Sequence, residues 1–267
     1  MIDQGKHNVL GVKIDAVDYD GAIHRVMTAA DQGRPMAVSA LAVHGLMTGS
    51  MDPTHRYRLN RFDLLCPDGQ PVRWALGWVH GAKLPDRVYG PNLMLKLCQR
   101  AAETGTPIFL FGGSEELLAD LSTRLLEKFP DLPIAGTRAS KFRTITADER
   151  HELVEEVRAS GAKMCFVGLG CPRQEVFAYE MREALGMPLL AVGAAFNFHA
   201  QRLSQAPKWM QDRGLEWFYR LMKEPRRLWR RYLMLNPMYL TLLGLQATGL
   251  HTRSPEGEEP MTEVCYG

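Results

Sequence analysis

The chain has 267 residues, of which 46% are hydrophobic and 23% are charged, and its formal net charge is +2. These values are typical of a folded protein with one large domain, alone or with an appendage. The small net charge provides no global basis for nucleic-acid binding. The five cysteines include no Cys-x-x-Cys pair, which indicates a reducing compartment and neither a disulfide framework nor a zinc site. Residues 1–15 contain no apolar core long enough for a signal peptide, so we expect a cytoplasmic location.

Short apolar runs alternate with amphipathic stretches of helical length from residue 8 to residue 192. The predicted strands are 9–14, 36–41, 62–66, 108–112, 132–136, 164–168 and 189–193. Helices are predicted at 114–129, capped by Ser114, and at 146–160, capped by Thr146. This alternation predicts an α/β fold with a Rossmann-like, mostly parallel sheet flanked by helices.

The character of the sequence changes after residue 206. Eight Lys/Arg and only three acids occur in residues 208–231, and Pro225 is expected to end one helix and begin the next. Residues 232–250 carry no charge, but their polar residues, glycines and proline argue against a membrane span. We therefore predict an α/β catalytic domain at 1–206, a basic and aromatic helical appendage that associates with a membrane at 207–250, and a disordered tail at 251–267.

Two predicted strands end in glycine-rich turns that lead into helices. The turns contain Gly112 and Gly113, and Gly168 and Gly170. Backbone N–H groups at such turns favour an anion, so together they predict a phosphate-bearing ligand at the C-terminal edge of the sheet. Tight turns without a ligand are the alternative, because Arg173 stands where a dinucleotide fingerprint has its third glycine. Gln174 and Glu175 lie just past the second turn, where they can contact a ligand.

Asp68 follows a predicted buried strand, within a Pro-Asp-Gly turn. That tripeptide is a common turn former, so a purely structural role is one interpretation. A carboxylate at this end of a parallel strand also lies where α/β active sites form, and there it can accept a proton from a substrate hydroxyl. Asp18 and Asp20 resemble a metal-binding Asp-x-Asp, but their place before a predicted helix favours capping. The eight histidines show no spaced ligand set, so we predict no metal.

Six segments, in this order, resemble the WecG/TagA/CpsF glycosyltransferase family. They are PDG at 67–69, DRVYGPNL at 86–93, FLFGG at 109–113, VGLGCPRQE at 167–175, AVGAAFNFHA at 191–200 and APKWMQDRGLEWFYRLMKEPRRLWRRY at 206–232. The resemblance covers residues 8–235 and implies an inverting transferase of α/β fold. It implies a UDP-sugar donor, an acceptor saccharide on undecaprenyl diphosphate at the inner face of the bacterial membrane, and no required cofactor.

The resemblance also implies roles for individual residues. Asp68 matches the proposed catalytic base of the family, and Arg87 and Gln174 match positions expected to hold the donor. With the glycine turns, the predicted donor-binding set is Ser39, Arg87, Gly112, Gly113, Gly168, Gly170, Gln174, Glu175 and Asn197. The C-terminal arginines of the family are expected to close over the site and bind diphosphate; here they are Arg220, Arg227 and Arg230.

Several positions depart from the family pattern. Ser39 replaces a threonine, Leu41 replaces an asparagine, and Asn197 replaces the aspartate of the usual Phe-Asp-Phe. Gln201 and Gln205 stand where glycine and arginine are common. Because such changes alter which sugar hydroxyls find a hydrogen-bond partner, they bear directly on sugar specificity.

The sequence leaves three functional classes open. The first is a glycosyltransferase of the family that the six segments resemble. The region around His44 resembles the exopolysaccharide branch of the family, which favours UDP-glucose as donor over the alternatives UDP-ManNAc and UDP-ManNAcA. A nucleotide-binding Rossmann oxidoreductase is the second class. The third glycine of the dinucleotide fingerprint is missing from this sequence, which argues against that class. The third class is a non-catalytic protein whose basic tail binds membrane or nucleic acid. Trp and Tyr beside Arg suit a lipid headgroup boundary, so we expect peripheral attachment to the inner face of the cytoplasmic membrane and no nucleic-acid partner.

Overall fold

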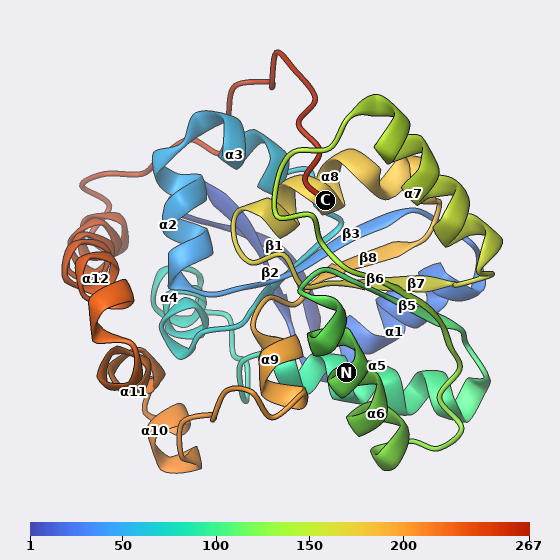
Figure 1. The fold of residues 1–267 in the computed structure, drawn as a ribbon. Coiled ribbons are helices and arrows are strands. Elements are labelled where there is room, and N and C mark those ends of the chain that lie inside the picture. Colours follow the sequence, from blue (N-terminus) through green and yellow to red (C-terminus); the bar gives the residue numbers. More distant parts are fainter.

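A six-stranded parallel sheet forms the centre of the protein, and helices cover both of its faces (Figure 1). The computed structural model describes the backbone of residues 1–267 and all side chains except those of Arg227, Arg230 and Arg231. The strands are β3 (Met36–Leu41), β4 (Leu64–Pro67), β5 (Ile108–Phe111), β6 (Ile134–Arg138), β7 (Met164–Val167) and β8 (Pro188–Ala191). They lie in the order β4-β3-β8-β7-β5-β6. The predicted α/β class with a Rossmann-like parallel sheet is confirmed.

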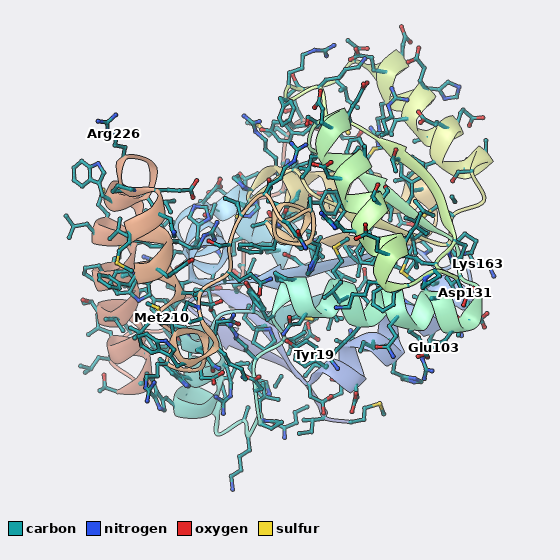
Figure 2. All side chains as sticks on the ribbon, turned by 60° about the horizontal axis from the view of Figure 1, so that its bottom comes forward. Tyr19, Glu103, Asp131, Lys163, Met210 and Arg226 are labelled. Atoms are coloured by element: carbon teal, nitrogen blue, oxygen red, sulfur yellow. The ribbon has the colours of Figure 1, made fainter. Side chains whose placement is uncertain are left out.

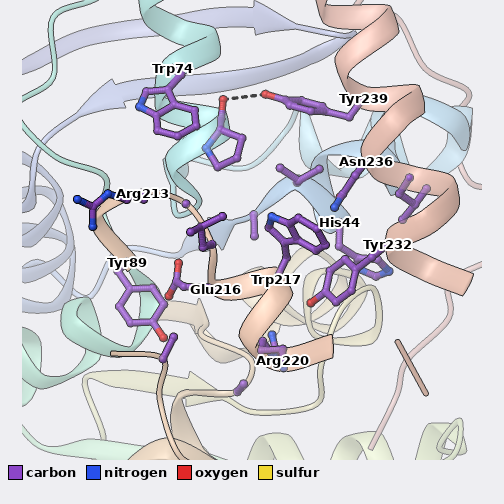
Figure 3. Close-up of a pocket in the computed structure, with 18 of the residues that line it drawn as sticks. His44, Trp74, Tyr89, Arg213, Glu216, Trp217, Arg220, Tyr232, Asn236 and Tyr239 are labelled. Atoms are coloured by element: carbon purple, nitrogen blue, oxygen red, sulfur yellow. Dashed lines mark hydrogen bonds between the residues drawn. The ribbon is translucent and has the colours of Figure 1, made fainter. Parts of the chain in front are cut away.

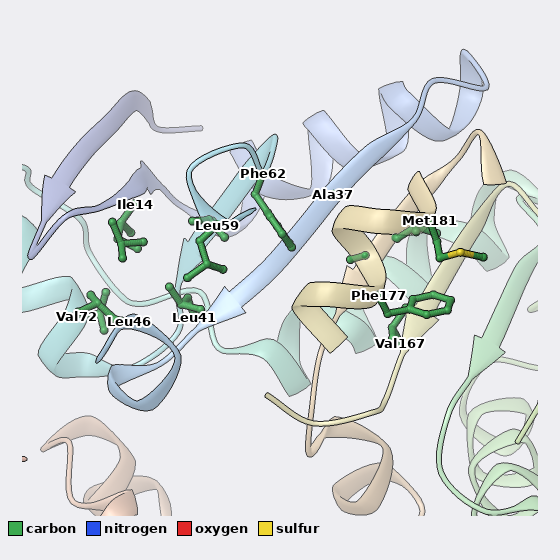
Figure 4. Close-up of a cluster of buried hydrophobic side chains, with 14 of the residues drawn as sticks. Ile14, Ala37, Leu41, Leu46, Leu59, Phe62, Val72, Val167, Phe177 and Met181 are labelled. Carbon is green, nitrogen blue, oxygen red and sulfur yellow. The ribbon is translucent and has the colours of Figure 1, made fainter. Parts of the chain in front are cut away.

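Each face of the sheet carries its own hydrophobic cluster, because successive side chains of a strand point to opposite faces. Phe109 and Phe111 of β5 belong to one cluster, whereas Ile108 and Leu110 belong to the other. The first face is covered by α2 (Val43–Met51), α3 (Pro53–Leu59), α4 (Gln70–His80), α7 (Ala147–Ala159) and α8 (Arg173–Leu185). The second is covered by α1 (Tyr19–Asp31), α5 (Gly90–Thr104), α6 (Glu115–Lys128) and α9 (Ala195–His199). Figure 4 shows part of the first cluster, where Phe177 of α8 lies against β7.

The predicted helix caps are confirmed. Ser114 Oγ accepts a hydrogen bond from Leu117 N (3.3 Å) at the start of α6. Thr146 and Glu149 form a reciprocal capping box at the start of α7. Asp18 caps α1, as favoured over a metal-binding role. These caps are local interactions between residues three apart, which is why the sequence predicts them well.

The predicted strand at 9–14 is wrong. The chain instead forms an antiparallel hairpin of β1 (Asp3–Val9) and β2 (Val12–Val17), separate from the main sheet. Leu10 and Gly11 make its two-residue turn, with φ values of 52° and 89°. Such turns require positive φ at both positions, and glycine adopts it freely. The sequence pattern does not reveal the turn, because Leu10 is apolar and continues the run of apolar residues. In the structure, Leu10 is only 2% exposed.

Three helices follow one another in the C-terminal part and lie together at one side of the molecule (Figure 1). They are α10 (Lys208–Asp212), α11 (Glu216–Lys223) and α12 (Pro225–Ala247). The predicted break at Pro225 is confirmed, but α12 continues through Pro237. Figure 2 shows Arg226 of α12 pointing away from the rest of the protein. Among the described residues, no helix combines the length and the apolar character that crossing a bilayer requires.

Helix α12 is fixed to the α/β part by polar contacts at two places. Tyr239 Oη donates a hydrogen bond to the carbonyl of Pro71 (2.8 Å) at the start of α4. Nearer its end, Gln246 accepts a bond from Leu10 N (2.9 Å) and donates one to Asn8 O (2.8 Å) in the hairpin. The proposed boundary between the α/β domain and the appendage near residue 206 stays a prediction.

Residues of the tail at 251–267 contact the α/β part, and the expected disorder of this tail stays a prediction. Asn8 Nδ2 donates to Arg253 O (2.9 Å), and Ile145 N donates to Cys265 O (3.0 Å). Cys265 is 8% exposed and joins the first hydrophobic cluster. The partners in these two hydrogen bonds are more than a hundred residues apart in the sequence.

Candidate active site

Asp68 lies at the C-terminal edge of the sheet, directly after β4. Its backbone N–H donates to Leu41 O (3.3 Å), which ties it to the end of the neighbouring strand β3. Its Oδ1 accepts a hydrogen bond from Gly90 N (2.8 Å), the first residue of α5. The partial positive charge of a helix N-terminus favours a carboxylate there. A side chain at position 90 would place its Cβ only 3.0 Å from Ala40 Cβ, so glycine permits this close approach.

Burial raises the pKa of Asp68 to about 7, and the Glu216 carboxylate acts in the same direction. The Arg87 guanidinium, the Gly90 N–H and Arg220 favour the charged form and oppose this rise in the pKa. A carboxyl group that titrates near neutral pH is well matched to taking up a proton from a substrate hydroxyl. The predicted position of Asp68 at the strand edge is confirmed, and its catalytic role stays a prediction.

Arg87 lies beside Asp68 and is held by two residues of the C-terminal helices. It is 4% exposed, and its Nη1 donates to Glu216 Oε2 of α11. Its Nη2 donates to Gln211 Oε1 of α10 (3.3 Å), and its guanidinium carbon lies 4.4 Å from the centre of the Tyr89 ring. Ion pairing and cation–π contact together offset the desolvation of this buried cation.

A second polar group connects β3, α8 and the turn after β7. Ser39 Oγ and Gln174 Nε2 both donate to Glu175 Oε1, at 3.0 and 2.9 Å. Gly170 N donates to Gln174 Oε1 (3.2 Å), so the network reaches the turn itself. The three side chains are at most 4% exposed, and burial raises the pKa of Glu175. The structure thus brings four residues of the predicted donor set together and gives each of them a partner within the protein.

The two glycine turns lie side by side because β5 and β7 are neighbours. A Cβ on Gly112 would lie 2.9 Å from the backbone of Gly168, and one on Gly168 would lie 2.5 Å from the Phe196 ring. Gly113, with φ of 76°, would meet Leu117 at 2.6 Å. Packing therefore accounts for these glycines without a ligand, whereas a Cβ on Gly170 would meet open space.

The topology singles out the point between these two turns. From β5 the chain crosses to β6 on one side, and from β7 it crosses to β8 on the other. Ligands of open α/β sheets bind where neighbouring strands send their connections in opposite directions. The turns containing Gly112 and Gly170 meet that condition.

The remaining predicted residues have distinct surroundings. Asn197 is in α9, and its carbonyl accepts bonds from Arg202 N (2.9 Å) and Leu203 N (3.1 Å). Arg220 is on α11 and lines the cavity described below. The predictions for Arg227 and Arg230 fall on side chains outside the described part of the chain.

Two of the departures from the family pattern have a structural explanation. Leu41 is 1% exposed and packs in the first hydrophobic cluster, close against Gly45. Gln201 has φ of 58°, a left-handed conformation that favours glycine. The glycine usual at position 201 would adopt this conformation without steric cost.

A cavity of about 470 Å³ lies between the strand ends, α4 and the C-terminal helices (Figure 3). Its lining from the α/β part includes His44, Pro71, Trp74, Trp78, Tyr89, Pro91, Val192 and Ala194. Its lining from the C-terminal part includes Arg213, Glu216, Trp217, Arg220, Tyr232, Leu235, Tyr239 and Leu240. In Figure 3, Glu216 and Arg220 of α11 lie on the same side as Tyr89. The cavity is thus adjacent to the groups that set the pKa of Asp68.

Sequence reasoning missed Glu216 and Gln211 as partners of Arg87. One signal was present, because Glu216 is one of only three acids in the basic stretch 208–231. It precedes Arg220 by four residues, which places both side chains on one face of α11. Their meeting with Arg87 depends on how α11 packs, which no local pattern encodes.

Among the described side chains, no three His, Cys, Asp or Glu residues gather in a way that could hold a metal ion. The expectation of a metal-free reaction stays a prediction. Arginines are the cations that the described site offers to a diphosphate, and arginine matches phosphate oxygens in a bidentate geometry.

Comparison with known protein families adds one finding to this geometry. Residues 7–253 match the family described as Glycosyl transferase WecG/TagA/CpsF family. The matched range includes β4 with Asp68, both glycine turns and all three C-terminal helices. The protein is therefore a member of the WecG/TagA/CpsF family of glycosyl transferases.

Proposed function

We propose that this protein is an inverting glycosyltransferase that uses Asp68 as its base. The observation that carries the proposal is the position of Asp68 at the strand edge, with its pKa raised to about 7 beside Arg87 and Arg220. The donor is a UDP-sugar, and the acceptor is a saccharide carried on undecaprenyl diphosphate. The pathway is exopolysaccharide or cell-envelope polysaccharide synthesis.

The donor binds at the switch point of the sheet, over the two glycine turns. Support comes from the switch point of the sheet and from Gly170, which has open space beside it. Gln174 and Glu175 hold the second turn in place through their hydrogen bonds to Gly170 and Ser39. UDP-glucose is the first choice of donor, and UDP-ManNAc and UDP-ManNAcA are the alternatives.

The reaction proceeds by a single displacement. Asp68 takes the proton of the acceptor hydroxyl, whose oxygen attacks the anomeric carbon from the face opposite UDP. The bond from that carbon to the diphosphate breaks, and UDP leaves with the electron pair. Arginines of the C-terminal helices neutralise the departing diphosphate without a metal.

The acceptor reaches the site from the inner face of the cytoplasmic membrane, to which the C-terminal helices attach peripherally. Support comes from the exposed apolar side chains of α12, among them Trp229, Leu233 and Met234. Tryptophan and arginine side chains are suited to the boundary between headgroups and acyl chains.

A donor screen tests the proposal. Purified protein is incubated with UDP-glucose, UDP-ManNAc, UDP-ManNAcA or UDP-GlcA and with a lipid-linked acceptor, and UDP release and the anomeric configuration of the product are measured. We expect one donor to give a product of inverted configuration, and Asp68→Asn to lose turnover while it still binds UDP. A product of retained configuration, or tight NAD binding without any response to UDP, contradicts the proposal.

A further inference from the structure

The cavity beside Asp68 has two ends of different chemistry. At one end it is lined by Tyr89, Glu216 and Arg220, near the strand ends. At the other, Trp74 of α4 and Tyr239 of α12 lie across the space from each other (Figure 3). The apolar lining continues with Pro71, Trp78, Leu235 and Leu240. The cavity is therefore polar near the base and mostly apolar between α4 and α12, where Asn236 of α12 also lines it.

The apolar end reaches the protein surface. Trp78 is 65% exposed and Leu240 is 61% exposed, although both line the cavity. The hydrogen bond from Tyr239 to the Pro71 carbonyl fixes α12 against the start of α4 and so maintains the distance between these two helices. A long apolar group that enters here passes between the two helices and leaves at the protein surface beside Trp78 and Leu240.

The charges at the polar end fit an anionic head group. Glu216 forms an ion pair with Arg87, which offsets its negative charge. Arg213 and Arg220 also line the cavity and contribute positive charge. A molecule that matches the whole cavity therefore carries phosphate at one end and an apolar chain at the other. A nucleotide sugar would match only the polar end.

We propose that the space between α4 and α12 binds the first isoprenoid units of the lipid carrier of the acceptor, with the diphosphate of that carrier toward Arg220. This site rests on the proposed function, because it assumes a lipid-linked acceptor. The cavity of about 470 Å³ falls within the roughly 300–1,000 Å³ of pockets that bury ligands of this size. The protein then holds both the diphosphate and the start of the chain, and only the remaining chain stays in the membrane.

Calorimetry with soluble prenyl diphosphates tests the site in the full-length protein without a membrane. Inorganic diphosphate, dimethylallyl diphosphate and farnesyl diphosphate form a series with one head group and increasing apolar length. We expect the Kd to fall by at least about tenfold from dimethylallyl to farnesyl diphosphate, because each buried methylene contributes to binding. The heat-capacity change of binding becomes more negative along the series, as burial of apolar surface requires. Equal Kd values along the series overturn the proposal.

A matched pair of variants locates the site. Leu240→Glu changes a cavity-lining residue, and Leu233→Glu changes a residue of the same helix that is 68% exposed and does not line the cavity. Both positions are exposed, so both variants are expected to fold, which circular dichroism checks. We expect Leu240→Glu to weaken farnesyl diphosphate binding by about tenfold or more and to leave inorganic diphosphate binding unchanged. Leu233→Glu keeps the wild-type Kd, and equal losses in both variants overturn the assignment.

Transfer assays separate failure of this site from failure of the proposed function. If no UDP-sugar is consumed with any lipid-linked acceptor, the proposed function is wrong, whatever the Kd values for prenyl diphosphates. If the sugar is transferred with the same KM to acceptors with dimethylallyl and farnesyl chains, the proposed function stands and the isoprenoid site is wrong. If KM falls with chain length in the wild type and not in Leu240→Glu, both the proposed function and the isoprenoid site are supported.

Discussion

Arg87 and Glu216 form an ion pair that joins the α/β part to helix α11, beside Asp68. Arg87 comes from the segment between α4 and α5, and Glu216 begins α11. Both charges act on Asp68, since Arg87 lowers its pKa and Glu216 raises it. The docking of the C-terminal helices and the protonation of the proposed base are therefore linked through one contact.

The ion pair predicts a change in pH dependence. Glu216→Gln removes a negative charge and frees the Arg87 guanidinium, and both effects lower the pKa of Asp68. We expect the acidic limb of kcat/KM to move to lower pH and the Tm to fall, because a buried cation loses its partner. Asp212→Asn is the control, since Asp212 is an exposed acid of α10 paired with Lys208. An acidic limb unchanged by Glu216→Gln contradicts the link.

The raised pKa of Asp68 predicts the shape of the wild-type pH profile. The base acts only when deprotonated, so kcat/KM is expected to rise with pH and to level off above about pH 7. The measurement is initial rate against pH at low acceptor concentration. A limb near pH 4, the ordinary range of an exposed carboxyl, would show that burial does not govern this group.

The same pKa predicts a stability difference. Between pH 4 and 7 the unfolded chain has lost the Asp68 proton while the folded protein still holds it, so the free energy of unfolding falls as pH rises through this window. Asp68→Asn cannot titrate, so it does not lose this stability as pH rises. Its amide oxygen can still accept the hydrogen bond from Gly90 N. We expect the variant to be more stable than the wild type at pH 8, by on the order of a few kcal/mol. Chemical denaturation at pH 5 and pH 8 measures the difference, which should be smaller at pH 5.

A pair of glycine substitutions tests whether the turn after β7 binds an anion. Gly170 and Gly186 have φ of 77° and 67°, and a Cβ at either position meets nothing within 4 Å. Ala at either site should therefore cost a similar stability, roughly 1 kcal/mol, because both need a left-handed backbone. We expect only Gly170→Ala to weaken UDP binding, as measured by calorimetry. Equal UDP affinity in both variants would remove the turn from the donor site.

The exposed apolar side chains of α12 predict membrane attachment. Leu233 and Met234 are 68% and 69% exposed, and replacing both with Asp should lower binding to anionic vesicles by roughly tenfold. Vesicle sedimentation measures the bound fraction. Leu126→Asp on α6 is the control, because Leu126 is 41% exposed on a helix outside the C-terminal part. Unchanged sedimentation of the double variant would show that α12 does not contact the membrane.

The sequence by itself determined the strands of the main sheet, the caps and the position of the proposed base. The strand predicted at 36–41 matches β3 residue for residue, and Ser114 and Thr146 cap their helices as predicted. These features follow from apolar periodicity and from hydrogen bonds between near neighbours, which are local properties of the chain. Asp68 was placed correctly because the C-terminal ends of parallel strands meet at one edge of a sheet.

Only the tertiary structure decided what surrounds that base. The packing of the tail near Cys265 and the partner of Arg87 depend on residues brought together from distant parts of the chain. Glu216 is 129 positions from Arg87 in the sequence, and no periodicity or motif connects them. The cavity between α4 and α12 has the same origin, because its walls come from helices whose contact is set by packing and by the bond from Tyr239 to Pro71.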